Sequence, residues 1–182
     1  MTAIKEGDIE VLISAAEIQA RIKSLADEIS DADFKNLLVI AILKGSFIFA
    51  ADLLRAMQSV GLGPEVDFVT LSSYRKGTQS TGSVQILRDI DLDVSGRDVL
   101  LIDDILESGR TLAFAKDLIS ARGASQIKTC VLLNKTVRRS AEIEADFKAF
   151  ECPDYFVVGY GMDLAYRYRE LPFVGRVVRS ES

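Results

Sequence analysis

The chain has 182 residues, of which 48% are hydrophobic and 27% charged, a composition typical of one folded globular domain. Its 22 basic and 27 acidic residues give a net charge of −5, which argues against a general nucleic-acid-binding role. The chain contains no histidine, which excludes Ser-His-Asp and Cys-His hydrolases and the common zinc sites that contain histidine. A metal would therefore be held by oxygen ligands, which favours Mg²⁺ or a related ion.

The sequence carries no signal for a membrane or for export. No apolar run reaches the roughly 20 residues that a membrane-spanning helix needs, and the N-terminus lacks the apolar segment of a signal peptide. Cys130 and Cys152 provide neither a disulfide framework nor a metal-binding spacing, and Cys130 lies in an apolar run that we expect in the core. We expect one cytoplasmic domain over residues 1–182, with no nucleic-acid or membrane partner.

The first half of the chain alternates between helix and strand. A capping box at Ser14–Glu17 predicts the start of a helix. The nearly all-apolar run Asn36–Leu43 is typical of a central parallel strand, and a helix that ends before Gly61 follows it. Val66–Ser73 is predicted as the next strand. The apolar positions expected to face the core are Ile18, Ile22, Leu25 and Ile29 in the first helix and Phe47, Ala50, Leu53, Leu54 and Met57 in the second.

The second half continues the alternation. The polar segment Tyr74–Gly82 is typical of a loop, Thr111–Arg122 is predicted as a helix, and Arg138–Phe150 is charged and irregular. This order indicates an α/β fold with a mostly parallel sheet and helices on both faces. Further strands are predicted at Ser83–Leu87, Val99–Ile102, Ile127–Leu133, Tyr155–Tyr160 and Gly175–Val178.

The stretch Val99–Leu112, VLLIDDILESGRTL, combines an apolar strand, two adjacent carboxylates, a polar turn and the start of a helix. Unpaired N–H groups at a helix N-terminus suit a phosphate, and carboxylates at the end of a strand accept hydrogen bonds from vicinal hydroxyls. A phosphorylated sugar therefore fits. The stretch has neither the Walker A pattern nor a G-x-G-x-x-G pattern. An ordinary strand, turn and helix is the alternative interpretation.

Polar residues also follow three other predicted strands. They are Lys44-Gly45, Lys135 and Asp163. Because open α/β sheets collect their ligands at the carboxyl ends of the strands, these residues are expected to be neighbours in space. Each of them could also be an ordinary surface or turn residue.

Val99–Leu112 resembles the phosphoribosyl-pyrophosphate signature of the type I phosphoribosyltransferases. The resemblance runs from about Leu37 to about Arg176 and points to the 6-oxopurine branch of that family. Four further motifs carry it, in order: LKGS at 43–46, SSY at 72–74, LLNKT at 132–136 and YFVVGYGMD at 155–163.

The resemblance implies a fold and an activity. The fold would be a central, mostly parallel twisted sheet flanked by helices, with a small hood built from the terminal segments. The activity would be purine salvage: transfer of the phosphoribosyl group from phosphoribosyl pyrophosphate to N9 of hypoxanthine, and of guanine, with Mg²⁺ as cofactor. The family is usually dimeric or tetrameric, so a homodimer or homotetramer is expected.

The resemblance also assigns roles to residues. Glu107 would be the general base at N7 and Lys135 the donor to the 6-oxo group. A non-proline cis peptide is implied in the pyrophosphate loop at Lys44-Gly45. The implied phosphoribosyl site comprises Asp103, Asp104, Glu107, Ser108, Gly109, Arg110 and Thr111. The implied pyrophosphate site comprises Lys44, Gly45, Ser73, Tyr74 and Arg169; the purine site comprises Lys135, Phe156, Val157 and Asp163; and the Mg²⁺ ligands are Asp103, Asp104 and Asp163.

Glu107 departs from the family pattern, which usually has Asp at this position. The extra methylene moves the carboxylate by roughly one bond length, and misplacement on that scale can cost ~10²-fold in rate. A catalytically weak relative that serves as a nucleotide-sensing or RNA-binding regulator is therefore the alternative function. Transfer to a pyrimidine or to orotate fits the signature but not Lys135 with YFVVGYGMD.

Overall fold

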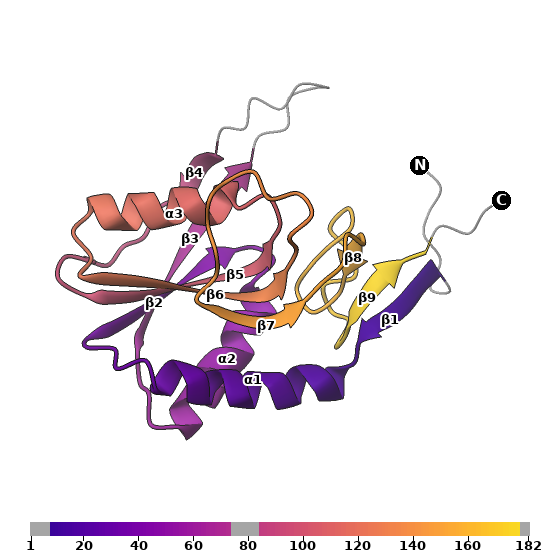
Figure 1. Cartoon of the computed structure of the whole chain (residues 1–182), viewed down its shortest axis with the longest axis horizontal. Helices are drawn as coiled ribbons and strands as arrows, with labels where there is room; N and C mark the ends of the chain where they lie inside the picture. Colours follow the sequence, from indigo (N-terminus) through magenta and orange to yellow (C-terminus); the bar gives the residue numbers. More distant parts are fainter. Residues whose placement is uncertain (1–7, 74–83, 179–182) are drawn as a thin grey trace.

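A computed structural model describes residues 8–73 and 84–178 of the chain (Figure 1). The elements in chain order are β1 (Ile9–Ile13), α1 (Ala15–Ser30), β2 (Leu37–Leu43), α2 (Phe47–Ser59), β3 (Glu65–Ser73), β4 (Val84–Arg88), β5 (Asp98–Leu106), α3 (Arg110–Ala121), β6 (Gln126–Asn134), β7 (Phe147–Glu151), β8 (Val157–Val158) and β9 (Val174–Val177). The predicted loop Tyr74–Gly82 lies outside the described residues. No helix in the described ranges is long and apolar enough to cross a membrane.

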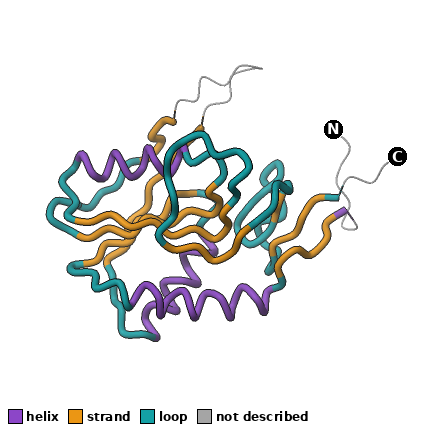
Figure 2. Tube along the Cα trace, viewed as in Figure 1, coloured by secondary structure: helices purple, strands orange, loops and turns teal. Residues whose placement is uncertain are grey.

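The main sheet has six strands in the order β4-β3-β2-β5-β6-β7. Every neighbouring pair is parallel except β3 and β4, which are antiparallel. Helices α1 and α2 cover one face and α3 covers the other (Figures 1 and 2). The predicted α/β class with a mostly parallel sheet is confirmed.

The strand periodicity of two explains why both faces are covered. In β2, Val39 and Ala41 face the core beneath α1 and α2, whereas Leu38 and Ile40 face the core beneath α3. A strand that is apolar on both sides must be buried on both sides. Cys130 of β6 is fully buried, as expected.

Helix α1 begins as the sequence predicts. The Ser14 hydroxyl accepts a hydrogen bond from the Glu17 N–H, and the Glu17 carboxylate accepts one from the Ser14 N–H. In α2 the prediction for Phe47 is wrong, because its side chain is 43% exposed and its ring lies beside Gly161. Phe49 is buried under the sheet instead.

The terminal segments form the expected hood. It is a three-stranded antiparallel sheet in the order β1-β9-β8, beside the main sheet (Figure 1). The sequence did not reveal β1, and the predicted strand Tyr155–Tyr160 shrinks to β8 because the chain turns at Gly159 and Tyr160, both with positive φ. The irregular segment Arg138–Phe150 ends in β7, which pairs with the edge of β6.

Candidate functional site

A cavity of about 490 Å³ opens at the carboxyl ends of β2, β5 and β6. It brings together most of the predicted site residues, although they are far apart in the sequence. The charged residues in its lining are Lys44, Asp104, Glu107, Lys135, Arg138, Asp154, Asp163 and Arg169, and Leu43, Gly45, Tyr155, Phe156 and Val157 are among the others.

The two carboxylates at the end of β5 lie at different depths. Asp104 lines the cavity, whereas Asp103 is only 6% exposed and is not among the lining residues. The Asp103 carboxylate accepts a hydrogen bond from the Asp104 N–H at 3.0 Å. Burial, and then the neighbouring Asp104 charge, raises the pKa of Asp103 well above its ordinary value; burial also raises the pKa of Asp104.

Two segments of backbone pack closely beside Asp104, one against its carboxylate and the other against the first segment. The resemblance implied a cis peptide in the loop at Lys44-Gly45, and the structure has one at the bond Leu43–Lys44, which enters that loop. A Cβ added to Gly45 would lie 1.7 Å from an Asp104 carboxylate oxygen, and one added to Gly161 would lie 2.2 Å from the Gly45 carbonyl oxygen. Only glycine permits both approaches.

The turn between β5 and α3 presents a helix N-terminus. Gly109 is the N-cap residue of α3, has φ +80°, and makes no side-chain capping hydrogen bond. Ser108 and Thr111 are partly exposed, and Arg110 is exposed. The first N–H groups of an α-helix have no partner within the helix, so this turn can accept an anion.

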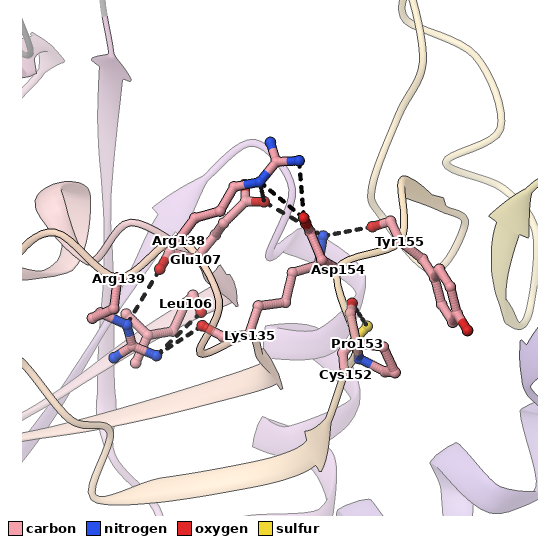
Figure 3. Close-up of polar contacts among 9 residues, drawn as sticks. All are labelled: Leu106, Glu107, Lys135, Arg138, Arg139, Cys152, Pro153, Asp154 and Tyr155. Carbon is pink, nitrogen blue, oxygen red and sulfur yellow. Dashed lines mark hydrogen bonds and ion pairs between the residues drawn. The ribbon is translucent and has the colours of Figure 1, made fainter.

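Glu107 and Lys135 face each other across the cavity. The Lys135 ammonium lies 3.7 Å from a Glu107 carboxylate oxygen and donates a hydrogen bond to the Tyr155 carbonyl at 2.7 Å (Figure 3). Lys135 is only 4% exposed, yet it lines the cavity. An ammonium group has three N–H donors, so it can serve Tyr155 and a ligand together.

The segment around β8 forms another wall of the cavity. Phe156 is 57% exposed, while its carbonyl accepts a hydrogen bond from the Val177 N–H of β9. Val157 is buried and pairs with Arg176. An exposed aromatic ring on a fixed backbone offers a stacking surface.

Asp163 and Arg169 pair with each other at the remaining wall. The Arg169 guanidinium lies 2.6 Å from one Asp163 carboxylate oxygen and donates to the Gly161 carbonyl. The other Asp163 oxygen accepts from the Tyr166 N–H. Of the remaining predicted residues, Ser73 ends β3, and Tyr74 lies outside the described residues.

Sequence reasoning missed Arg138 and Asp154. The Arg138 guanidinium forms an ion pair with Asp154 at 3.0 Å and lies 4.0 Å from the Glu107 carboxylate (Figure 3). The only signal was a pair of adjacent arginines shortly after Lys135, within a segment that had been predicted as irregular.

The phosphoribosyl transferase domain family matches residues 13–165 of the chain. The chain belongs to this family. Its relatives are named for purine bases: the hypoxanthine phosphoribosyltransferase of Escherichia coli K12 is 43% identical over 173 residues, which are 93% of this chain and 96% of the relative. The hypoxanthine-guanine phosphoribosyltransferase of Bacillus subtilis is 46% identical over 171 residues, which are 92% of this chain and 93% of the relative.

Solved phosphoribosyltransferase structures agree with the fold described above. The crystal structure of a hypoxanthine phosphoribosyltransferase from Staphylococcus aureus aligns with a TM-score of 0.88 at 39% identity, over 97% of this chain and 96% of that one. The predicted membership of the hypoxanthine-guanine branch of the phosphoribosyltransferases is confirmed.

The raised pKa of Asp103 predicts a penalty for stability in this phosphoribosyltransferase. The native state holds the Asp103 proton more tightly than the unfolded state does, so stability falls as the pH rises above the ordinary aspartate pKa of about 3.9. An asparagine side chain at position 103 can still accept the hydrogen bond from the Asp104 N–H, but it does not ionise. We expect Asp103→Asn to raise the free energy of unfolding of the metal-free protein at pH 7, and the difference from the wild type to grow between about pH 4 and pH 7.

Urea denaturation at a series of pH values measures this difference. Asp117→Asn, at an exposed position of α3, is the matched control and should follow the wild-type curve. A constant difference between Asp103→Asn and the wild type across this range would contradict the prediction.

Proposed function

We propose that the protein transfers the phosphoribosyl group of phosphoribosyl pyrophosphate to N9 of hypoxanthine, and of guanine, in purine salvage. The products are IMP or GMP and pyrophosphate. The observation that carries the proposal is the pairing of Glu107 with Lys135 at 3.7 Å, beside a helix N-terminus and the exposed ring of Phe156. One cavity thus offers a base, a cationic donor, an anion site and a stacking surface.

The phosphoribosyl end of the donor occupies the turn before α3. The N–H groups of residues 107–111 bind the 5′-phosphate, and the hydroxyls of Ser108 and Thr111 add donors. Asp104 accepts hydrogen bonds from the ribose hydroxyls. The Asp103 carboxylate helps to fix the position of Asp104, because it accepts a hydrogen bond from the Asp104 N–H.

The base lies between Lys135 and the β8 segment. Lys135 donates to the 6-oxo group, and its positive charge opposes the amino edge of a 6-amino purine. Phe156 stacks on the ring, and the backbone of Val157 reads the edge of the base.

The transfer forms the bond from N9 to C1′ and breaks the bond from C1′ to the pyrophosphate oxygen, whose electron pair leaves with pyrophosphate. The proton on N7 passes to the Glu107 carboxylate. The negative charge of Asp104 favours the positive charge that develops at C1′. Glutamate and aspartate have similar pKa values, so Glu107 can perform the chemistry of the usual Asp.

The donor set suits Mg²⁺. Asp104 and Asp163 line the same cavity, and Mg²⁺ is commonly bound by one or two carboxylates together with substrate phosphates. When bound, the ion would neutralise the charge of the leaving pyrophosphate. Lys44, the Gly45 backbone and Arg169, which line the same cavity, bind the pyrophosphate itself.

The regulator alternative has less support. Residues for every part of the transfer line or adjoin one cavity, and the net charge of −5 does not suit an RNA-binding surface.

Nucleotide formation from phosphoribosyl pyrophosphate and Mg²⁺ tests the proposal. We expect turnover when hypoxanthine or guanine is supplied. We expect none with adenine, because Lys135 requires an acceptor at position 6, and none with uracil, because a pyrimidine has neither N7 nor N9. Omitting Mg²⁺ should abolish turnover. Absence of product with every base, xanthine included, would reject the enzyme and favour a screen for nucleotide and RNA binding.

The role of Glu107 as the base predicts different effects for its two closest substitutions. Glu107→Gln should lower kcat by about 10²–10⁴-fold, because an amide cannot take the N7 proton. Glu107→Asp keeps a carboxylate but draws it back by roughly one bond length, so it should lose less activity than Glu107→Gln. Steady-state kinetics with hypoxanthine measure both, and equal activity of the Gln and Asp variants would show that another group takes the proton.

We further propose that the chain forms a homodimer or homotetramer. Light scattering should then give a mass that is two or four times the 20.0 kDa of one chain. A solution mass of one chain would refute this.

A further inference from the structure

The guanidinium of Arg139 lies beneath the two residues proposed to act on the base (Figure 3). Its Nε donates a hydrogen bond to the Glu107 carbonyl at 3.2 Å, and one of its terminal nitrogens donates to the Lys135 carbonyl at 3.0 Å. One side chain therefore holds the main chain of both residues. Glu107 follows β5 and Lys135 follows β6. These strands pair at Leu106 and Asn134, and the Lys135 N–H donates to the Leu106 carbonyl, so Arg139 adds a side-chain link just beyond the end of the β5–β6 pairing.

The same guanidinium reaches three more acceptors. They are the carbonyls of Leu106 and Ile143 and the side-chain oxygen of Asn134, the last at 2.7 Å. All five acceptors are neutral oxygens, so none of these contacts is an ion pair. A planar fork with five N–H donors can satisfy this set, whereas an ammonium group cannot span it.

The segment that carries Arg139 also packs on the proposed phosphate turn. The N–H groups of Ser140 and Ala141 both donate to the Ser108 carbonyl, at 3.0 and 3.1 Å. A Cβ added to Gly109 would lie 3.1 Å from the Arg139 side chain and 2.7 Å from that of Ile143. Residues 139–143 thus form a brace that packs against the turn, and Arg139 makes its side-chain hydrogen bonds to Glu107 and Lys135.

We propose that Arg139 is a positioning residue that sets the spacing between the Glu107 carboxylate and the Lys135 ammonium. This inference rests on the proposed function. Arg139 is not among the residues that line the cavity, so it acts through the backbone of Glu107 and Lys135, which are. A displacement of about 1 Å in such a pair can cost ~10²-fold in rate, so the arrangement matters for kcat more than for substrate binding.

Arg139→Lys is the first test, because it keeps the charge and removes the fork. We expect kcat with hypoxanthine to fall about 10–100-fold while KM for phosphoribosyl pyrophosphate changes by less than about threefold. Arg21→Lys is the matched control. The Arg21 guanidinium also bridges main-chain carbonyls, those of Lys148 and Ala149, but it lies between α1 and β7, away from the cavity. Arg21→Lys should lower the free energy of unfolding without lowering kcat.

Chemical rescue is the second test. Millimolar guanidinium, well below denaturing concentrations, should restore part of the activity of Arg139→Ala, and the same concentration of sodium chloride should not. A purely structural role would produce no such recovery in a folded variant.

Three results would overturn the inference: wild-type kcat in Arg139→Lys, a loss of kcat no larger than in Arg21→Lys, or folded Arg139→Ala that guanidinium does not rescue. Failure of both Arg139 variants to fold would also overturn it, since the guanidinium would then serve the fold. These results differ from failure of the proposed function, in which the wild-type protein itself would form no nucleotide.

Discussion

The cavity exists because the carboxyl ends of parallel strands meet at one edge of a sheet. Ala41 of β2 pairs with Ile102 of β5, and Ile102 pairs with Cys130 of β6. The residues that follow these positions therefore emerge side by side. This register, set by apolar side chains in the core, brings the Lys44 loop, the Asp104 carboxylate and the buried Lys135 to one cavity.

Close packing at that edge of the sheet depends on two glycines, Gly45 and Gly161, which have no side chain to keep neighbouring segments apart. Gly45 lets the backbone after β2 lie against the Asp104 carboxylate, and Gly161 lets the loop after β8 lie against Gly45. A ligand bound there would meet main chain from three segments. Glycine is the residue that permits such close approach of backbone to a neighbouring segment or a ligand.

The electrostatic design opposes stability. Burial beside Asp104 raises the pKa of Asp103, so the charged form of this pair is costly to the folded protein. The basic residues Lys44, Lys135, Arg138 and Arg169 line the same cavity as Asp104, Glu107 and Asp163. Such a concentration of charges in one cavity lowers the stability of the folded protein, as is common at functional sites. The apolar cores on both faces of the sheet offset this loss.

The sequence by itself determined the α/β class, the start of α1 and the family, because each depends on residues that are close together in the chain: a capping box, apolar strands and VLLIDDILESGRTL. Through the resemblance it also implied a cis peptide in the loop at Lys44-Gly45, and the structure has it at the bond Leu43–Lys44. Only the tertiary structure decided the depth of Asp103, the pairing of Asp163 with Arg169, and the brace of Arg139 under Glu107 and Lys135. It also decided that β1 joins β9, with Ile9 paired to Val177, and that β7 forms an edge of the sheet. These features arise from contacts between distant segments, whose geometry depends on how the sheet and its helices pack rather than on any local pattern.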